Sequence, residues 1–196
     1  MSTVVIEFIT LDGVVSDPDP SSGAPRAGWA FRHGPEPVSG DAFRLGRTLD
    51  EGVLLLGRRT WELFARIWPA RDDPFAARMN AADKLVVSST LDDEAAARTW
   101  PGSRVVAGDV ADAVRREGHE GHDVVVMGSL SVVRALQRAD LVDEYRLLTF
   151  PTVLGEGERL FPAGSAPAEL ECLSAEQVGA AVRTRHRRTG SPSARG

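Results

Sequence analysis

A glycine, two arginines and a threonine follow directly after an apolar run in the segment Leu54–Trp61. Gly57, Arg58, Arg59 and Thr60 stand where a buried strand gives way to a segment whose apolar residues recur at helical spacing. The start of a helix gathers backbone N–H groups without intrahelical partners and the positive end of the helix dipole. Guanidinium groups beside it add charged hydrogen bonds to phosphate oxygens. The segment therefore predicts a phosphate-binding strand–helix junction.

A second junction of the same kind follows the apolar run 124–127, where Gly128, Ser129 and Leu130 open another helical pattern. A single Gly-Arg-Arg step, taken alone, favours a plain strand–helix turn with solvated arginines. Two junctions of this type in one chain favour a ligand with two phosphates, such as a dinucleotide.

Composition excludes several other classes of protein. The chain has 196 residues, a net charge of −5 and a pI near 5.4, which argues against a non-specific nucleic-acid binder. The single cysteine, Cys172, cannot form an internal disulfide, and no cysteine or histidine cluster has zinc-like spacing. His119 and His122 lie in a glycine-rich turn that we interpret as a solvated loop. We therefore expect no metal site.

The sequence contains neither a recognisable signal peptide nor a transmembrane segment. The N-terminus has no basic segment, and Glu7 interrupts its first apolar run, so it does not resemble a signal peptide. No apolar stretch reaches the roughly 20 residues of a transmembrane helix. We expect a cytoplasmic protein that contacts neither membrane nor nucleic acid.

The elements that must position these junctions alternate between strand and helix. A single domain over 1–189 is expected, with a lid-like loop at 16–40 and a disordered tail at 190–196. The strand-rich end predicts an α/β fold with a mainly parallel sheet and antiparallel C-terminal edge strands. The expected strands are 3–9, 53–56, 84–88, 104–107, 123–127, 144–150, 170–177 and 180–187, and the expected helices are 41–51, 60–68, 75–82, a segment capped by Asp109, and 129–139.

Polar residues follow four of the expected strands. Ligands of such sheets bind beyond the carboxyl ends of the strands, so we expect these residues to converge there. They are Thr10 with Asp12, Gly57 with Arg58, Ser88 with Ser89, and Gly128 with Ser129.

With these segments placed, the chain resembles the dihydrofolate reductase-like superfamily, and more closely the reductase domain of bacterial riboflavin-biosynthesis deaminase–reductases and their stand-alone relatives. The resemblance extends over roughly Val4 to Arg187. Its markers are the segments 7–14, 28–31, 56–62, 73–75, 79–80, 141–146 and 151–157.

The resemblance implies NADPH as cofactor and hydride transfer to a C=N or C=O bond of a pterin-, pyrimidine- or flavin-like ring. It implies that Arg58 and Thr60 hold the cofactor phosphates, with Gly57 before them and Arg59 as an additional charge nearby. It implies further that Ser88 and Ser89 lie beside the adenosine ribose and its 2′-phosphate. The resemblance also implies that the step Gly128, Ser129 and Leu130 approaches the pyrophosphate and nicotinamide.

Two carboxylates compete for the role of catalytic acid. Asp41 lies sixteen residues before Gly57, which is the spacing of the acid in dihydrofolate reductases, but an aspartate at the start of a helix is also an ordinary cap. Asp12 belongs to the Leu-Asp-Gly step shared with riboflavin-type reductases, and an aspartate before glycine is also an ordinary turn residue. We slightly favour Asp12, which would also line the substrate site. Either acid needs a pKa raised by burial, or a proton relayed from water, to act near neutral pH.

Three aromatic residues in or near loops are candidates for stacking on a planar substrate: Trp29, Phe31 and Trp68. Relatives commonly dimerise through their C-terminal strands, so the resemblance implies a homodimer. The alternatives are a nucleotide-binding protein of the same fold without turnover, and an interaction module that uses the 16–40 loop.

Overall fold

The computed structural model describes residues 1–189, and the expected tail at 190–196 lies outside the described residues. The chain divides into two compact units. The first contains Met1–Val5 and Arg44–Val142, and the second contains Ile6–Phe43 and the chain from Asp143 onward. The strand β1 (Thr3–Thr10) contributes its first residues to one unit and the remainder to the other. The expectation of a single domain stays a prediction.

The first unit is a parallel sheet with helical crossovers. Its strand order is β4-β3-β2-β5-β1, and each of these pairs is parallel. Successive strands are joined through helices, as parallel pairing requires. The strands are β2 (Val53–Gly57), β3 (Asp83–Val87), β4 (Ser103–Val106) and β5 (Val124–Val126), and the helices are α1 (Arg47–Asp50), α2 (Arg58–Ile67), α3 (Pro74–Ala81), α4 (Asp93–Thr99), α5 (Val110–His119) and α6 (Leu130–Arg138).

Within this unit the apolar runs are the buried strands. Every residue of β2 and β5 is buried, as expected of central strands with both faces covered. α2 buries Trp61, whose indole N–H donates to Ser103 Oγ at 2.9 Å. Trp61 is therefore a core residue, as its helical spacing predicted.

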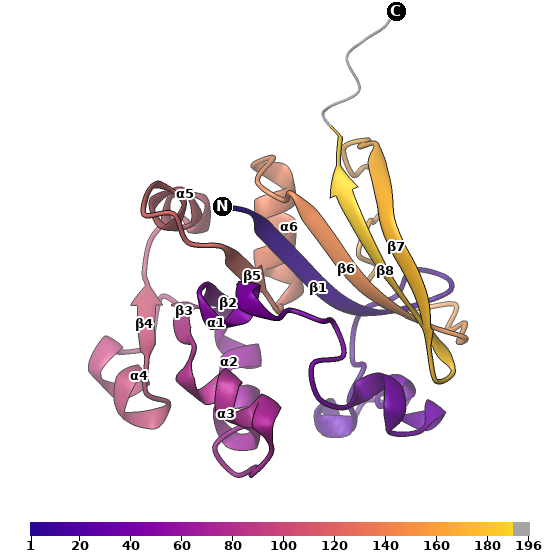
Figure 1. Cartoon of the computed structure of the whole chain (residues 1–196), viewed down its shortest axis with the longest axis horizontal. Coiled ribbons are helices and arrows are strands. Elements are labelled where there is room, and N and C mark those ends of the chain that lie inside the picture. The colour runs from indigo at the N-terminus through magenta and orange to yellow at the C-terminus, as the bar shows by residue number, and fades with distance from the viewer. Residues whose placement is uncertain (190–196) are drawn as a thin grey trace, which may run out of the picture. The chain divides into compact units, whose positions relative to one another are not determined.

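The second unit is antiparallel at its C-terminal side. The strands β6 (Glu144–Phe150), β7 (Leu170–Val178) and β8 (Ala181–Arg188) follow β1 in the order β1-β6-β8-β7. Figure 1 shows β6, β8 and β7 side by side in orange to yellow. β8 pairs antiparallel with both β6 and β7. The α/β class, with mainly parallel strands and antiparallel C-terminal strands, is confirmed.

The segment 16–40 is not an open loop. It contains three short 3₁₀ helices, η1 (Pro20–Ser22), η2 (Trp29–His33) and η3 (Glu36–Val38). Trp29 is completely buried and packs edge-on against Phe150, with ring centroids 5.6 Å apart. The segment therefore supplies part of the core of the second unit.

The structure differs from the expected elements in two places. The helix expected over 41–51 is limited to Arg47–Asp50, because Gly46 adopts a φ of +52° outside the helical region. Asp41 consequently lies on no helix. α4 was not expected. It is a short helix that starts at an aspartate cap, Asp92, whose side chain accepts a hydrogen bond from Ala95 N.

Within residues 1–189, none of the helices combines the length and the apolar character that crossing a membrane requires.

Candidate functional site: two uncapped helix starts and an adjoining cavity

The first expected junction forms as a strand–helix turn. β2 ends at Gly57, which is the N-cap of α2, and no side chain caps this helix. Arg58, Arg59 and Thr60 occupy its first turn. Their backbone N–H groups belong to the set that has no intrahelical acceptor. The turn therefore offers several donors and the positive end of a ten-residue helix.

The second expected junction has the same form. Gly128 follows β5 with a φ of +91°, and the peptide bond between Gly128 and Ser129 is cis. Ser129 is the N-cap of α6, whose first residue is Leu130, and its side chain does not cap the helix. The Ser129 hydroxyl instead lies 2.8 Å from that of Ser131. Here too the first N–H groups of a helix lack a side-chain acceptor.

The two helix starts are immediate neighbours. β2 pairs directly with β5, and Gly57 N donates to Gly128 O at 3.0 Å. A Cβ on Gly57 would lie 2.1 Å from Ser129 Oγ, and one on Gly128 would lie 3.3 Å from Thr60 Oγ1. The approach is thus close enough for one ligand to meet both sets of N–H groups.

Three other helices of the same unit start differently. Asp73 accepts from two N–H groups at the start of α3, Asp92 from one at the start of α4, and Asp109 from one at the start of α5. An aspartate cap satisfies the orphan donors and supplies a negative charge. α2 and α6 lack such a cap, so both favour an external anion.

A cavity of about 390 Å³ adjoins the start of α2. Its lining brings together three residues predicted from sequence, Arg58, Ser88 and Ser89. Arg59 is exposed but does not line this cavity. The cavity is lined by Arg58, Val87, Ser88, Ser89, Thr90, Val106, Ala107 and Gly108.

Asp12 forms a clamp within the second unit. Its carboxylate accepts from Thr10 Oγ1 at 2.6 Å, from Gly155 N at 2.8 Å and from Leu154 N at 3.3 Å. These hydrogen bonds, led by the one from Thr10, lower the pKa of Asp12 to about 2. Asp12 is therefore ionised near neutral pH and does not meet the condition of a raised pKa set for a catalytic acid. The geometry is that of a turn aspartate that fixes the 154–155 backbone.

Asp41 and the predicted aromatic residues occupy different environments. Asp41 is half-buried outside any helix, which removes the helix position that motivated it. Trp29 donates its indole N–H to Ser16 O at 2.9 Å and, being fully buried, has no ring face for a substrate. Phe31 is 50% exposed in the same 3₁₀ helix and can stack on a ligand. Trp68 is the C-cap of α2 and packs edge-on against two phenylalanine rings.

Glu7 is a feature that the sequence reasoning missed. It lies in the middle of β1, partly buried, and within residues 1–189 its carboxyl has no hydrogen-bond or ion-pair partner. Burial raises the pKa of Glu7 to about 8. The available signal was a lone acidic residue inside an otherwise apolar strand.

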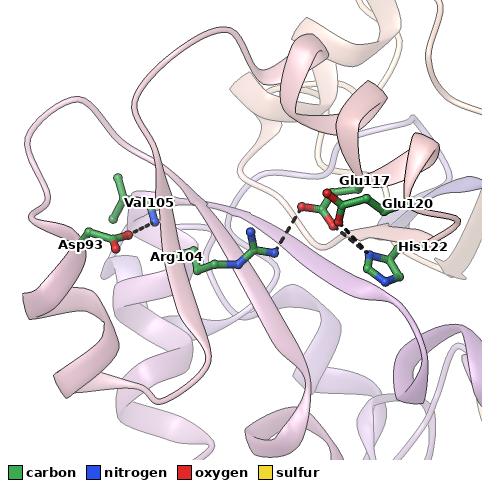
Figure 2. A network of polar contacts seen from close by, with 6 residues as sticks. All are labelled: Asp93, Arg104, Val105, Glu117, Glu120 and His122. Carbon is green, nitrogen blue, oxygen red and sulfur yellow. Dashed lines mark hydrogen bonds and ion pairs between the residues drawn. The ribbon is translucent and has the colours of Figure 1, made fainter.

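A cluster of possible metal ligands lies at the end of α5. Glu117, Glu120 and His122 bring their ligand atoms within 4.8 Å of one another. Figure 2 shows that Glu117 already has two partners: Arg104, at 3.2 Å, and His122, at 3.0 Å. A cation here would compete with the Arg104 guanidinium. We therefore interpret the cluster as a network of polar contacts around Glu117. The expectation of no metal site stays a prediction.

Comparison with known proteins assigns the family. Residues 3–184 match the model of the RibD C-terminal domain. The chain belongs to the RibD C-terminal domain family. It is also 27% identical over 118 residues to uncharacterized protein YyaP of Bacillus subtilis (strain 168). That match covers 56% of this chain and 58% of YyaP, so the chain spans little more than half the length of this relative.

Two solved structures share the fold of this RibD C-terminal domain protein. One is named "Putative riboflavin biosynthesis protein" from Shewanella sp. PV-4. It has a TM-score of 0.72 at 21% identity, over 97% of this chain and 100% of the other. The second is a pyrimidine reductase-like protein from Corynebacterium diphtheriae, with a TM-score of 0.55 at 10% identity, over 96% and 92% of the two chains. The resemblance to the dihydrofolate reductase-like superfamily and its riboflavin-type branch is confirmed.

The close approach of the two helix starts yields a first prediction for this RibD C-terminal domain protein. Gly57→Ala should lower the free energy of unfolding by about 1–3 kcal/mol, because the new methyl group overlaps Ser129 Oγ. The φ of Gly57 is −71°, which alanine adopts without strain, so the substitution tests steric overlap alone. Urea denaturation measures the change. Gly108→Ala is the matched control, since nothing lies within 4 Å of its added Cβ. Equal stabilities of the two variants would contradict the prediction.

The unpaired carboxyl of Glu7 yields a second prediction. The pKa is about 8 in the folded protein, against 4.5 for an unperturbed glutamate, so the folded protein retains this proton over pH 4.5–8 while the unfolded chain loses it. The Glu7 contribution to stability therefore falls as pH rises through that window, by at most about 1.4 kcal/mol per pH unit. Glu7→Gln should raise the melting temperature at pH 8 and change it little at pH 4.5. The same shift at both pH values would show that the carboxyl is not responsible.

Proposed function

We propose that this protein is an NADPH-dependent oxidoreductase that transfers a hydride to a C=N or C=O bond of a pterin-, pyrimidine- or flavin-like heterocycle. The observation that carries the proposal is the pair of adjacent, uncapped helix starts at Gly57 and Ser129 beside a cavity lined by Arg58. Membership of the RibD C-terminal domain family and the fold shared with a pyrimidine reductase-like protein support it.

The residues of the first unit suit the charges of NADPH. The N–H groups at the starts of α2 and α6 are donors for the pyrophosphate, as anions favour helix N-termini. The Thr60 hydroxyl lies beside Gly128 and can add a further donor. Arg58 would pair with the 2′-phosphate, and Ser88 and Ser89 would lie along the adenosine ribose. When bound, NADPH supplies the hydride.

Glu7 is our candidate for the proton donor. Hydride addition to a C=N bond leaves negative charge on nitrogen, and a positioned acid contributes typically about 100- to 10,000-fold in rate. Such an acid must hold its proton at working pH. Glu7 does so because burial raises its pKa to about 8, whereas the pKa of Asp12 is about 2.

The remaining expectations belong to the same proposal. The protein would act in the cytoplasm as a homodimer formed through its C-terminal strands. A nucleotide-binding protein without turnover would bind NADPH but reduce none of the candidate rings. An interaction module based on 16–40 is disfavoured, because Trp29 and Ala30 of that segment are fully buried.

A test of the cofactor assignment compares the two arginines. Wild-type protein should bind NADPH roughly ten- to a hundred-fold more tightly than NADH, because a charged hydrogen bond contributes about 1.5–3 kcal/mol. Arg58→Ala should abolish most of this preference, and Arg59→Ala should retain it because Arg59 does not line the cavity. Isothermal titration calorimetry measures both affinities. Equal affinities of the wild type for NADPH and NADH would contradict the choice of NADPH and the pairing of Arg58 with its 2′-phosphate.

A test of the acid compares Glu7→Gln with Asp12→Asn and Asp41→Asn. With NADPH and a panel of pterins, deaminated pyrimidines and flavins, single-turnover absorbance measures hydride transfer. Glu7→Gln should lose about 100-fold or more in rate while it still binds NADPH. Asp41→Asn should keep the wild-type rate. If Glu7→Gln turns over normally, Glu7 is not the acid, and loss of rate in Asp41→Asn alone would return that role to Asp41.

A further inference from the structure

The guanidinium of Arg58 is held on two sides before any ligand binds. Its Nε donates to Glu62 Oε1 at 2.8 Å, one helical turn away, and its Nη1 donates to Thr90 Oγ1. The side chain is 47% exposed, and an exposed arginine ordinarily loses much rotamer freedom when it becomes ordered. Within residues 1–189 the Nη2 of Arg58 has no acceptor, so two N–H donors of this cavity-lining residue remain for a ligand.

Thr90 is itself held in place by the end of β3. Ser88 Oγ accepts from Thr90 N at 3.2 Å and from Leu91 N at 3.0 Å. A serine that accepts hydrogen bonds from the backbone two and three residues onward fixes a turn. The acceptor side of Ser88 is thus occupied by the turn that presents Thr90. A chain of contacts therefore leads from β3 through Ser88 and Thr90 to the guanidinium at the start of α2.

We propose that Thr90 is a positioning residue that orients Arg58, and that the preference of this cavity for a 2′-phosphorylated adenosine depends on the Arg58–Thr90 hydrogen bond. This inference rests on the proposed function. A planar guanidinium recognises a phosphate through parallel N–H donors, so its orientation decides whether both can engage. A side chain ordered beforehand also loses less entropy on binding.

Thr90 is a better test of this idea than Glu62. Glu62 also holds Arg58, but its carboxylate brings a negative charge close to any bound phosphate. Removing the Glu62 carboxylate would change both the orientation of Arg58 and the charge near a bound phosphate. Thr90 holds Arg58 through a neutral hydroxyl, so Thr90→Val removes the hydrogen bond at nearly constant shape and charge.

The experiment compares two ligands that differ in the 2′-phosphate, adenosine 2′,5′-bisphosphate and adenosine 5′-phosphate, titrated calorimetrically into full-length protein. Thr90→Val should weaken binding of the bisphosphate roughly five-fold, or about 1 kcal/mol, because the Arg58 guanidinium loses the hydroxyl that orients it, and should leave binding of the monophosphate unchanged. Thr90→Ser keeps the hydroxyl and should restore wild-type discrimination. Thr99→Val is the matched control, because the Thr99 hydroxyl bonds to Ala95 O at 2.8 Å on α4, and Thr99 does not line the cavity.

The outcomes separate this inference from the proposed function. If the wild type does not distinguish the two ligands, the assignment of the 2′-phosphate to this cavity fails. If the wild type distinguishes them and Thr90→Val does so equally well, the cofactor assignment stands and the role of Thr90 is overturned. Equal weakening of both ligands in Thr90→Val would also overturn it, because that result indicates general disruption of the turn.

Discussion

Backbone N–H groups at the starts of α2 and α6 have no side-chain acceptor. The pairing of strands in the first unit brings these two helix starts together. Because β2 and β5 are parallel neighbours, the two helices begin at the same edge. Because Gly57 N bonds to Gly128 O, the two turns are nearly in contact. Glycine at position 57 is required by this approach, since a side chain would meet Ser129. An anion bound at this place would offset the unpaired donors of both helices.

Local signals in the sequence were sufficient for much of this unit. Asp73 followed by Pro74 predicted the start of α3, and Asp109 predicted the start of α5, because a cap depends on residues within one turn of it. The apolar runs before Gly57 and Gly128 predicted β2 and β5, because a run of consecutive apolar residues is also a local signal. Arg58, Ser88 and Ser89 converge on one cavity because parallel strands present their carboxyl ends together.

Features that depend on distant residues could not be predicted in this way. The burial of Trp29 depends on Phe150, more than a hundred positions later in the chain. The role of Asp12 depends on the amides of Leu154 and Gly155, so the sequence offered a carboxylate at a strand end but not its partners. The helix expected after Asp41 was lost to the backbone of Gly46, whose positive φ no periodicity reveals. The raised pKa of Glu7 likewise results from burial by residues that are distant in the sequence.

The isolated carboxyl of Glu7 has a consequence for engineering this protein. A library ranked by thermal tolerance at alkaline pH would enrich neutral replacements at this position, because they remove a partly buried carboxylate without a partner. If the same carboxyl serves the chemistry, the most heat-resistant clones would be the least active ones. Selection for robustness and selection for turnover would then diverge at a single residue of the first strand.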